Sequence, residues 1–333
     1  MRAFLVQAEG GRRTRGWSDI ADPVPGPTEV VVQVGAAALA WSDILQMEGT
    51  YAGPGPEPPF VSGHEFAGVV VGAGPEVAFL PGERVFGFLP SPAAFAEYVA
   101  APARCLLRTP DELDDRAAAA ITTSYLTADL ALLTIGGLTP GCSVLVHAGA
   151  GGVGRAALLL AQAYGAGTVI ATAGSLARRA AARERGASVA AGYDDFADVV
   201  LEHTDKRGVD LVLESVGGEV FDRSAEVTAA LGRLVTIGAS SGTRPKRLKL
   251  PFLWQRSLSV CGLHIISLRD QYPDAVEAAW GRVLGLLQEG RLDAGVGLAV
   301  APADLEHGMN ELRNRTVHGR VVIDFNDVER ATR

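Results

Sequence analysis

Cysteine is scarce in this chain of 333 residues, and its scarcity excludes two classes of protein. Cys105, Cys142 and Cys261 lie far apart, and none belongs to a C-x-x-C pair. A disulfide framework needs paired cysteines and a thiolate-rich zinc site needs closely spaced ones, so both are excluded. We expect reduced thiols that are mostly buried.

Excess positive charge and long uninterrupted apolar runs are also missing. Lys and Arg total 30 against 38 Asp and Glu, which gives a net charge of −8. Because such a chain has no basic field to hold a phosphate backbone or an anionic membrane, we expect no nucleic-acid partner and no membrane association. The N-terminal apolar run is too short for a secretory signal, and longer apolar runs are interrupted by glycine or charge, so we expect a cytoplasmic protein.

The chain changes character near residue 120. Before it, β-branched runs such as EVVVQVGAAAL (29–39) alternate with Pro- and Gly-rich stretches such as YAGPGPEPPF (51–60), which is typical of a loop-rich β-domain. After it, apolar strands alternate with helical segments, as in CSVLVHAG (142–149), which leads into GVGRAALLLAQAYGA (152–166). A further helix is predicted at VFDRSAEVTAALG (220–232). The pattern predicts an α/β protein, with a doubly wound parallel sheet and a β-rich second domain.

The strongest functional motif lies at the first strand-to-helix crossover. In VLVHAGAGGVG (144–154) the spacing G-x-G-x-x-G directly follows an apolar strand and directly precedes an amphipathic helix. This context favours a dinucleotide-binding turn, in which the helix N-terminus faces the pyrophosphate. The predicted binding residues are Gly149, Gly151, Gly152, Val153 and Gly154. The alternative is a glycine-rich turn without a ligand.

The kind of nicotinamide cofactor is indicated about twenty residues further on, where NAD-binding folds place an acid on the ribose. This chain has ATAGSLARR (171–179) there, with no acid. Ser175 can donate to a phosphate, and Arg178 or Arg179 offers a guanidinium that matches the 2′-phosphate of NADPH. The sequence therefore favours NADPH, unless these arginines only cover an exposed helix face.

Several motifs in order resemble those of a known family. GHEFAGVVVGAGPEV (63–77), LTADLAL (126–132) and HAGAGGVG (147–154) are similar to segments of the medium-chain dehydrogenase/reductases, in particular the zinc-free quinone oxidoreductase and enoyl reductase branch. The resemblance implies an NADPH-dependent oxidoreductase that is a homodimer. It also implies a GroES-like catalytic domain in two parts, residues 1–122 and 265–333, around a Rossmann domain at 123–264.

The resemblance also assigns binding residues. Thr127 matches a threonine that touches the cofactor, and Tyr193 and Arg178 match residues that contact the adenosine phosphate. Gly238 follows the segment that resembles the fifth cofactor-domain strand, and it is predicted to bind NADPH as well. The substrate cleft that the family implies is expected to be bordered by Trp41, Trp254 and His264. Their side chains suit an apolar enone, a quinone or an acyl thioester.

Zinc-dependent members of the family carry three ligands at places that Ala40, His64 and Thr123 hold here. Ala and Thr bind zinc poorly and no cysteine cluster for a structural zinc is present, so we predict no metal. His64 and Glu65 then resemble retained residues that are hydrogen-bonded in the wall of the site. A catalytic role of His64 as an acid or base stays open.

The segment SDILQMEGTY (42–51) resembles the one in which mitochondrial-type enoyl thioester reductases present a tyrosine to the substrate. Hydride addition to such a substrate builds negative charge on oxygen, which needs a donor. A phenol is protonated at neutral pH, so Tyr51 is predicted to be the proton donor. Alternatively, Tyr51 packs under the Pro-rich loop at 53–59 or lines the pocket. Asp43 fits both branches, whereas Ala40 replaces an asparagine of typical quinone oxidoreductases.

Three other hypotheses stay open. The basic stretch at 244–249 could receive a phosphopantetheine or a carrier-protein surface, or it could be a solvated loop. The chain could be a non-catalytic NADPH-binding protein, like relatives that serve as lens proteins or vesicle-associated factors. It could also be a zinc-type alcohol dehydrogenase, which metal analysis would reveal. The sequence does not name the physiological acceptor.

Overall fold

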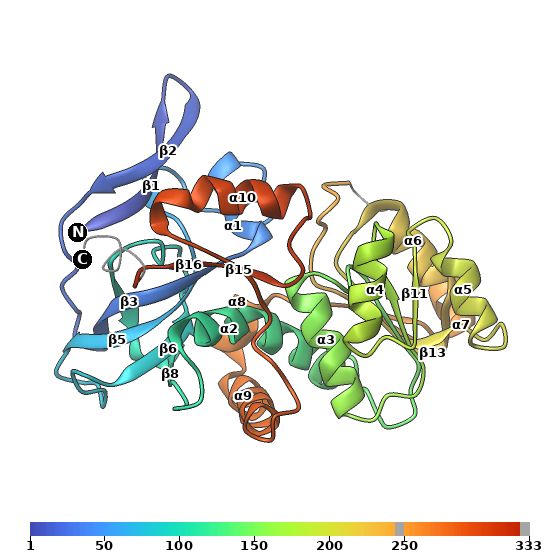
Figure 1. The fold of residues 1–333 in the computed structure, drawn as a ribbon. Coiled ribbons are helices and arrows are strands. Elements are labelled where there is room, and N and C mark those ends of the chain that lie inside the picture. Colours follow the sequence, from blue (N-terminus) through green and yellow to red (C-terminus); the bar gives the residue numbers. More distant parts are fainter. Residues whose placement is uncertain (244–249, 327–333) are drawn as a thin grey trace. The chain divides into compact units, whose positions relative to one another are not determined.

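The computed structural model describes residues 1–243 and 250–326, which form two compact units (Figure 1). The first unit comprises Met1–Thr123 together with the chain from Ala294 onward, and the second comprises Ser124–Asp293. The helix α2 (Asp115–Asp129) runs across the division. The predicted boundary between residues 122 and 123 lies within this helix, next to the observed division.

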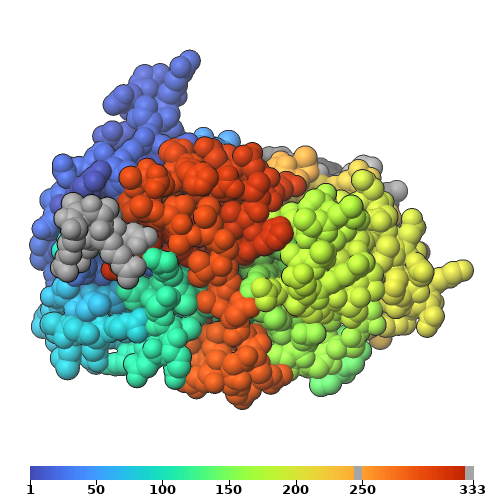
Figure 2. Space-filling view, in the orientation of Figure 1, coloured from blue at the N-terminus to red at the C-terminus, as the bar shows by residue number. Residues whose placement is uncertain are grey.

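The first unit is built on β-sheets. Its elements are β1 (Arg2–Glu9), β2 (Arg12–Asp19), β3 (Glu29–Leu39), α1 (Trp41–Glu48), β4 (Phe60–Val61), β5 (Glu65–Ala73), β6 (Arg84–Phe88), β7 (Tyr98–Pro102), η1 (Ala103–Cys105), β8 (Leu106–Arg108), β15 (Val296–Val300), η3 (Pro302–Asp304), α10 (Leu305–Arg313) and β16 (Arg320–Asp324). In the described part of the chain, one sheet has the order β15-β16-β3-β5-β6-β8, with β7 also paired to β3. A smaller sheet, β2-β1-β4, carries the β1–β2 hairpin that projects from the surface of this unit (Figure 2).

The long strand β3 lies at the centre of this unit. It pairs with β16, β5 and β7, and its run VVVQVGAAAL is buried at nearly every position. The core that forms around it includes Val32, Phe66 and Phe95. The C-terminal strand β16 therefore pairs directly with the N-terminal part of the chain.

The second unit is an α/β sandwich. Its elements are η2 (Leu130–Ile135), β9 (Val144–Val146), α3 (Gly152–Ala163), β10 (Val169–Thr172), α4 (Leu176–Glu184), β11 (Val189–Ala191), α5 (Phe196–Glu202), β12 (Val209–Glu214), α6 (Gly218–Glu226), β13 (Thr228–Thr236), α7 (Leu250–Arg256), β14 (Ser259–Gly262), α8 (Ile265–Gln271) and α9 (Pro273–Gln288). Its described strands form one parallel sheet of order β11-β10-β9-β12-β13-β14. The predicted fold class is confirmed. The strand order reverses between β9 and β12, where such sheets bind ligands beyond their carboxyl ends.

The helix predicted at 220–232 is shorter than expected. It ends as α6 at Glu226, and β13 begins at Thr228. Val209 N donates to Val227 O over 3.0 Å and Thr228 pairs with Val209, so this segment completes the sheet instead of extending the helix. Strand pairing thus overrides the helical pattern of the Ala- and Leu-containing sequence.

The return to the first unit occurs later than the predicted boundary at residue 265. The helices α8 and α9 belong to the second unit, which extends to Asp293. Arg282 on α9 donates to both oxygens of the buried Asp129, and Arg291 donates to Ala163 O over 2.9 Å. These long-range contacts hold α9 and the segment after it against the rest of the second unit. No local sequence pattern predicts them.

The α2 helix continues directly into the π-helix η2. By length and composition, the continuous helix Asp115–Ile135 is apolar enough to cross a membrane, although 72% of its apolar window is buried inside the protein. Its one interior charge, Asp129, accepts hydrogen bonds from Tyr164 and Arg282. This degree of burial is that of a core helix.

Two helical glycines test the packing. Gly285 on α9 has open space around a Cβ, whereas a Cβ on Gly308 of α10 would lie 3.0 Å from Val321 Cγ1. Gly285→Ala should therefore raise the free energy of unfolding by about 0.5–1 kcal/mol, because alanine restricts the unfolded chain and favours helix. Gly308→Ala should lower it by overpacking. Urea unfolding of both variants measures this, and changes of the same sign would contradict the packing described.

Candidate active site

The predicted phosphate-binding turn lies between β9 and α3. Gly151 caps α3 with an extended backbone (φ −86°, ψ 173°), and its N–H donates to Ala148 O over 2.8 Å. Position 154 needs glycine, because a Cβ there would lie 2.2 Å from Ala148 O. The turn presents the N-terminus of α3, with its unpaired N–H groups, to an anion. The other predicted residues of this turn and of the first turn of α3 are Gly149, Gly152 and Val153.

The residues predicted to bind the adenosine end gather at the carboxyl ends of β10 and β11. Ser175 caps α4, and its Oγ accepts from Arg178 N over 3.3 Å. Tyr193 follows β11, and its Cε2 lies 3.9 Å from the position of a Cβ on Gly174. Arg178 and Arg179 are half-buried on the first turns of α4. Within this unit, the structure thus brings the hydroxyl of Ser175, a guanidinium and a phenol to one edge of the sheet.

Two further predicted cofactor residues are also in the second unit. Gly238 follows β13 at the same carboxyl edge of the sheet, and its carbonyl lies 3.4 Å from Thr236 Oγ1. Thr127 is half-buried on α2.

The sequence interpretation missed the buried carboxylate of Glu214, which ends β12. Its Oε1 accepts from Val216 N and Gly217 N, both over 2.7 Å. Burial raises the pKa of this carboxyl group, and the two N–H donors oppose that rise. Glu214 therefore fixes the turn that follows β12, next to the phosphate-binding turn in the strand order. The signal in the sequence that could have indicated this residue is an acid at the end of an apolar strand.

In the first unit, α1 places a buried carboxylate in the wall of the candidate site. Asp43 is fully buried, and its Oδ2 accepts from Ala40 N over 2.8 Å at the start of α1. Burial raises the pKa of Asp43 to about 6, against the opposing effects of His64 and of the Ala40 N–H.

His64 is held by two oxygen atoms. Its Nδ1 lies 3.0 Å from Leu89 O and its Nε2 lies 3.1 Å from Gln46 Oε1. The imidazole therefore joins α1 to the segment after β6. An oxygen contact at each nitrogen, of which a neutral ring can donate to one, suits the wall position expected from the sequence. The candidate role of His64 as an acid or base remains a prediction.

Glu65 completes this wall. Its Oε1 pairs with the Arg320 guanidinium and its Oε2 accepts from Thr123 N over 2.9 Å. Both charged side chains are buried. The carboxylate thus joins β5, α2 and β16.

The residues of this wall do not fit a catalytic zinc. The family places two of its ligands where this chain has the methyl group of Ala40 and the hydroxyl of Thr123, and both oxygens of Glu65 are already engaged. In the described part of the chain, no group of three or more His, Cys, Asp or Glu side chains could hold a metal ion. Zinc needs three or four such donors.

Tyr51 lies just beyond α1, which ends at the left-handed Gly49 (φ 72°). The half-buried ring packs beside Gly53, where a Cβ would lie 2.9 Å from Tyr51 Cε1 and 3.5 Å from its hydroxyl oxygen. Among the described residues, the hydroxyl has no hydrogen-bond partner. The ring therefore has the loop contact expected of a packing residue, and its hydroxyl is available to donate.

The three predicted substrate residues lie on different elements. Trp41 begins α1 in the first unit, and its Nε1 is buried without a hydrogen-bond partner in the described chain. Trp254 on α7 is 65% exposed. His264 caps α8, where its Nδ1 accepts from Ser267 N over 3.4 Å and lies 2.7 Å from Ser267 Oγ. The basic stretch at 244–249 lies outside the described residues.

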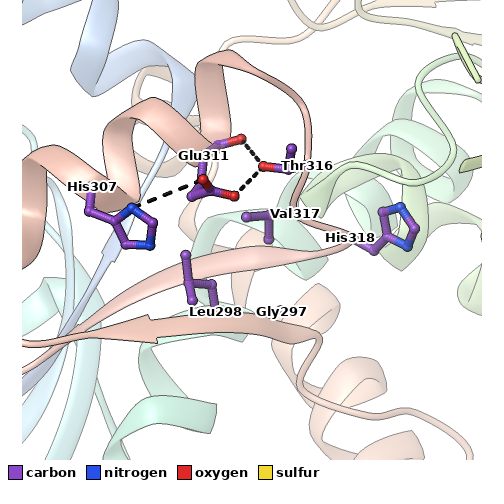
Figure 3. A pocket seen from close by; sticks show the side chains of 7 residues that line it. All are labelled: Gly297, Leu298, His307, Glu311, Thr316, Val317 and His318. Atoms are coloured by element: carbon purple, nitrogen blue, oxygen red, sulfur yellow. Dashed lines mark hydrogen bonds and ion pairs between the residues drawn. The ribbon is translucent and has the colours of Figure 1, made fainter.

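A surface pocket of 430 Å³ opens elsewhere on the first unit, beside α10 and the loop that leads to β16 (Figure 3). It is lined by Gly297, Leu298, His307, Glu311, Thr316, Val317 and His318. Three of its polar side chains partner one another, since Thr316 donates to Glu311 and His307 Nδ1 lies 4.0 Å from Glu311 Oε1. The residues predicted for catalysis and cofactor binding lie outside this lining.

Comparisons with known proteins agree with this architecture. Residues 26–111 match the alcohol dehydrogenase GroES-like domain, and residues 152–281 match the zinc-binding dehydrogenase family. Over 293 residues the chain is 36% identical to the mycocerosic acid synthase-like polyketide synthase of Mycobacterium tuberculosis, covering 86% of this chain and 14% of that protein. The chain spans only 10–14% of the length of the first curated relatives it matches.

Two relatives match along most of their own length. The human synaptic vesicle membrane protein VAT-1 homolog is 30% identical over 320 residues, covering 91% of this chain and 80% of that protein. The quinone oxidoreductase of Thermus thermophilus, whose structure was determined alone and with NADPH, is 33% identical with a TM-score of 0.84, covering 98% of this chain and all of that one. The chain belongs to the medium-chain dehydrogenase/reductase family, and the solved structures that it resembles include quinone oxidoreductases.

The buried Asp43 predicts a pH dependence of stability. Its folded pKa of about 6 exceeds its ordinary value of 3.8, so between these values the folded protein binds more protons than the unfolded chain. The stabilisation from the protonated carboxyl group is fully present below pH 3.8 and is lost as the pH rises through 6. At 1.36 kcal/mol per pH unit, the loss is about 3 kcal/mol.

Asp43→Asn removes this titration while keeping an oxygen for Ala40 N. The unfolding free energy of the variant minus that of the wild type should therefore grow by about 2.4 kcal/mol between pH 4 and pH 7. Urea unfolding of both proteins at several pH values measures the difference. Parallel pH profiles would show that Asp43 does not titrate in this way.

Proposed function

We propose that this chain is an NADPH-dependent reductase that acts without zinc on a carbon–carbon double bond conjugated to a carbonyl group. An α,β-unsaturated thioester is the favoured substrate and a quinone is the second candidate. One observation carries the proposal. Two places that hold zinc ligands in related dehydrogenases are Ala40 and Thr123 here, whereas Tyr51 offers a phenol hydroxyl without a partner in the described chain.

The second unit has groups that fit NADPH. The turn at Gly149–Gly154 would receive the pyrophosphate at the N-terminus of α3, and Ser175, Arg178 and Tyr193 would receive the adenosine phosphate. When bound, NADPH supplies a hydride. The absence of an acid after β10 supports a 2′-phosphate in preference to a free ribose hydroxyl.

The first unit supplies the groups that manage charge and protons. Hydride addition to the β-carbon of an enoyl thioester leaves negative charge on the thioester oxygen, which a neutral hydroxyl donor stabilises. Tyr51 would donate to that oxygen. The bonds of Glu65 and His64 hold the adjoining wall in one arrangement, so that the donor need not reorganise during the reaction.

The substrate classes draw support from different relatives. The thioester is favoured because the relatives include polyketide synthases, at 36–38% identity. The quinone is supported by the full-length likeness to a quinone oxidoreductase. We further propose a homodimer formed through β14, which is the last strand of the parallel sheet and exposes Val260.

A substrate panel tests the proposed function. NADPH consumption should be fastest with a medium-length enoyl thioester and slower with 1,2-naphthoquinone. A simple alcohol with NADP⁺ should give no NADPH formation. The rates should be unchanged after treatment with a zinc chelator. Turnover of the alcohol that depends on zinc would overturn the proposal, and NADPH binding without turnover of any acceptor would indicate a non-catalytic binding protein.

Arg178 should select the cofactor. Arg178→Ala should weaken NADPH binding by about 1.5–3 kcal/mol, the range for a charge-assisted hydrogen bond, and leave NADH binding almost unchanged. Arg183→Ala, in the last turn of the same helix, is the matched control and should alter neither affinity. Isothermal titration with both cofactors gives the four values, and equal losses for NADPH and NADH in Arg178→Ala would refute the assignment.

Tyr51→Phe should separate the two substrate classes. The ring keeps its place beside Gly53, so folding and NADPH affinity should be preserved, while kcat for the enoyl thioester falls about 10²–10⁴-fold. A quinone can take its protons from water, so its turnover should fall much less. Tyr98→Phe on β7 is the control. Steady-state kinetics with both acceptors measures these changes. An unchanged kcat for both would show that Tyr51 only lines the pocket and is not the proton donor.

A further inference from the structure

A fully buried histidine, His147, lies in the second unit. His147 directly follows β9 and precedes the phosphate-binding turn. Its Nδ1 lies 2.9 Å from Thr172 Oγ1 at the end of β10, and its Nε2 lies 2.7 Å from Ser224 Oγ on α6. The imidazole therefore joins two neighbouring strands to a helix that packs on the sheet.

The hydrogen bonds fix the tautomer of this ring. Ser224 has one hydroxyl proton, and it donates that proton to Val220 O over 2.6 Å. Ser224 Oγ must then accept from His147, which places the ring proton on Nε2, and Nδ1 accepts from the Thr172 hydroxyl. Burial lowers the pKa of His147 to about 3, so the ring is neutral at neutral pH. Both nitrogens are satisfied, and the ring has one orientation.

This oriented ring supports Tyr193. The ring centroids of His147 and Tyr193 are 6.3 Å apart with an interplanar angle of 21°, and Phe196 packs edge-on against His147 with centroids 5.0 Å apart. Arg223 donates to Tyr193 O and Asp194 O, both over 2.9 Å, and its guanidinium lies 4.8 Å from the centroid of the Phe196 ring. The backbone and the ring of Tyr193 are thus both restrained.

The orientation of the Tyr193 ring is important for binding because of the residues beside it. Its ring lies beside Gly174, the residue before Ser175, at the strand end where dinucleotide-binding sheets meet the 2′-position of the ribose. We infer that His147 is a positioning residue that orients the Tyr193 phenol toward the 2′-phosphate, and that Arg223 supports the same arrangement. This inference rests on the proposed NADPH dependence.

The expected effect follows from the population of the oriented ring. An aromatic pair is worth about 0.5–1.5 kcal/mol, so its loss reduces the ratio of oriented to other Tyr193 ring states by roughly 2- to 12-fold. The apparent affinity for NADPH falls by up to the same factor. NADH lacks the 2′-phosphate, so its affinity should be preserved.

The test is a double-mutant cycle in the full-length chain. His147→Gln keeps a polar side chain but removes the ring, and it should raise the Kd for NADPH by up to about 12-fold while leaving the Kd for NADH unchanged. In a Tyr193→Phe background, which lacks the phenol hydroxyl, His147→Gln should cause no further loss of NADPH affinity. Equal losses for the two cofactors, or additive losses for NADPH in the cycle, would overturn the inference.

A second test changes Arg223 and leaves the buried His147 ring in place, in case His147→Gln does not fold. Arg223→Met should also weaken NADPH binding selectively. Arg256→Met is its matched control, since Arg256 likewise donates to a carbonyl oxygen, that of Thr228, and lies over an aromatic ring, that of Phe252. Arg223→Met without a selective loss would contradict the inference. A wild-type protein that binds neither cofactor would instead refute the proposed function.

Discussion

The carboxylate of Glu65 is the constraint on which the first unit depends. It accepts from Thr123 N at one oxygen and pairs with Arg320 at the other, and so it ties β5 to α2 and to the C-terminal strand β16. Removing one partner of a buried ion pair costs about 3–5 kcal/mol, because the remaining charge stays buried without compensation. The protein therefore uses this charge to hold the wall of the site.

The second unit applies a similar principle with uncharged hydrogen-bond partners. Glu214 fixes the turn after β12 through two backbone N–H groups, and His147 fixes the region between β9 and β10 through two hydroxyls. Both residues are buried at strand ends, where the parallel sheet meets its ligand. The glycine-rich turn supplies close backbone approach, and these polar side chains keep the surrounding turns in place. Rigid surroundings reduce the entropy that binding must overcome.

Much of the fold could be predicted because its signals are local. Apolar strands, amphipathic helices and the glycine spacing before α3 each occupy a short segment, and they predicted the parallel sheet and the tight turn between β9 and α3. Contacts between distant segments could not be predicted in this way. The helix at 220–232 ended early because β12 pairs with Thr228, and α9 joined the second unit because Arg282 meets Asp129. The cap that His264 forms with Ser267 and the stack of His147 on Tyr193 likewise depend on side-chain directions that exist only in the folded chain.

We propose that hydride is transferred from NADPH to a carbon–carbon double bond and that side chains of this chain, without zinc, stabilise the resulting charge. The most direct measurement follows the hydrogen atoms. A crotonyl thioester is reduced with NADPH that carries deuterium at the transferring C4 position, in the presence of a zinc chelator, and the product is analysed by NMR. The account predicts deuterium at the β-carbon and solvent hydrogen at the α-carbon. A product without deuterium, or a reduction that stops when zinc is removed, would contradict it.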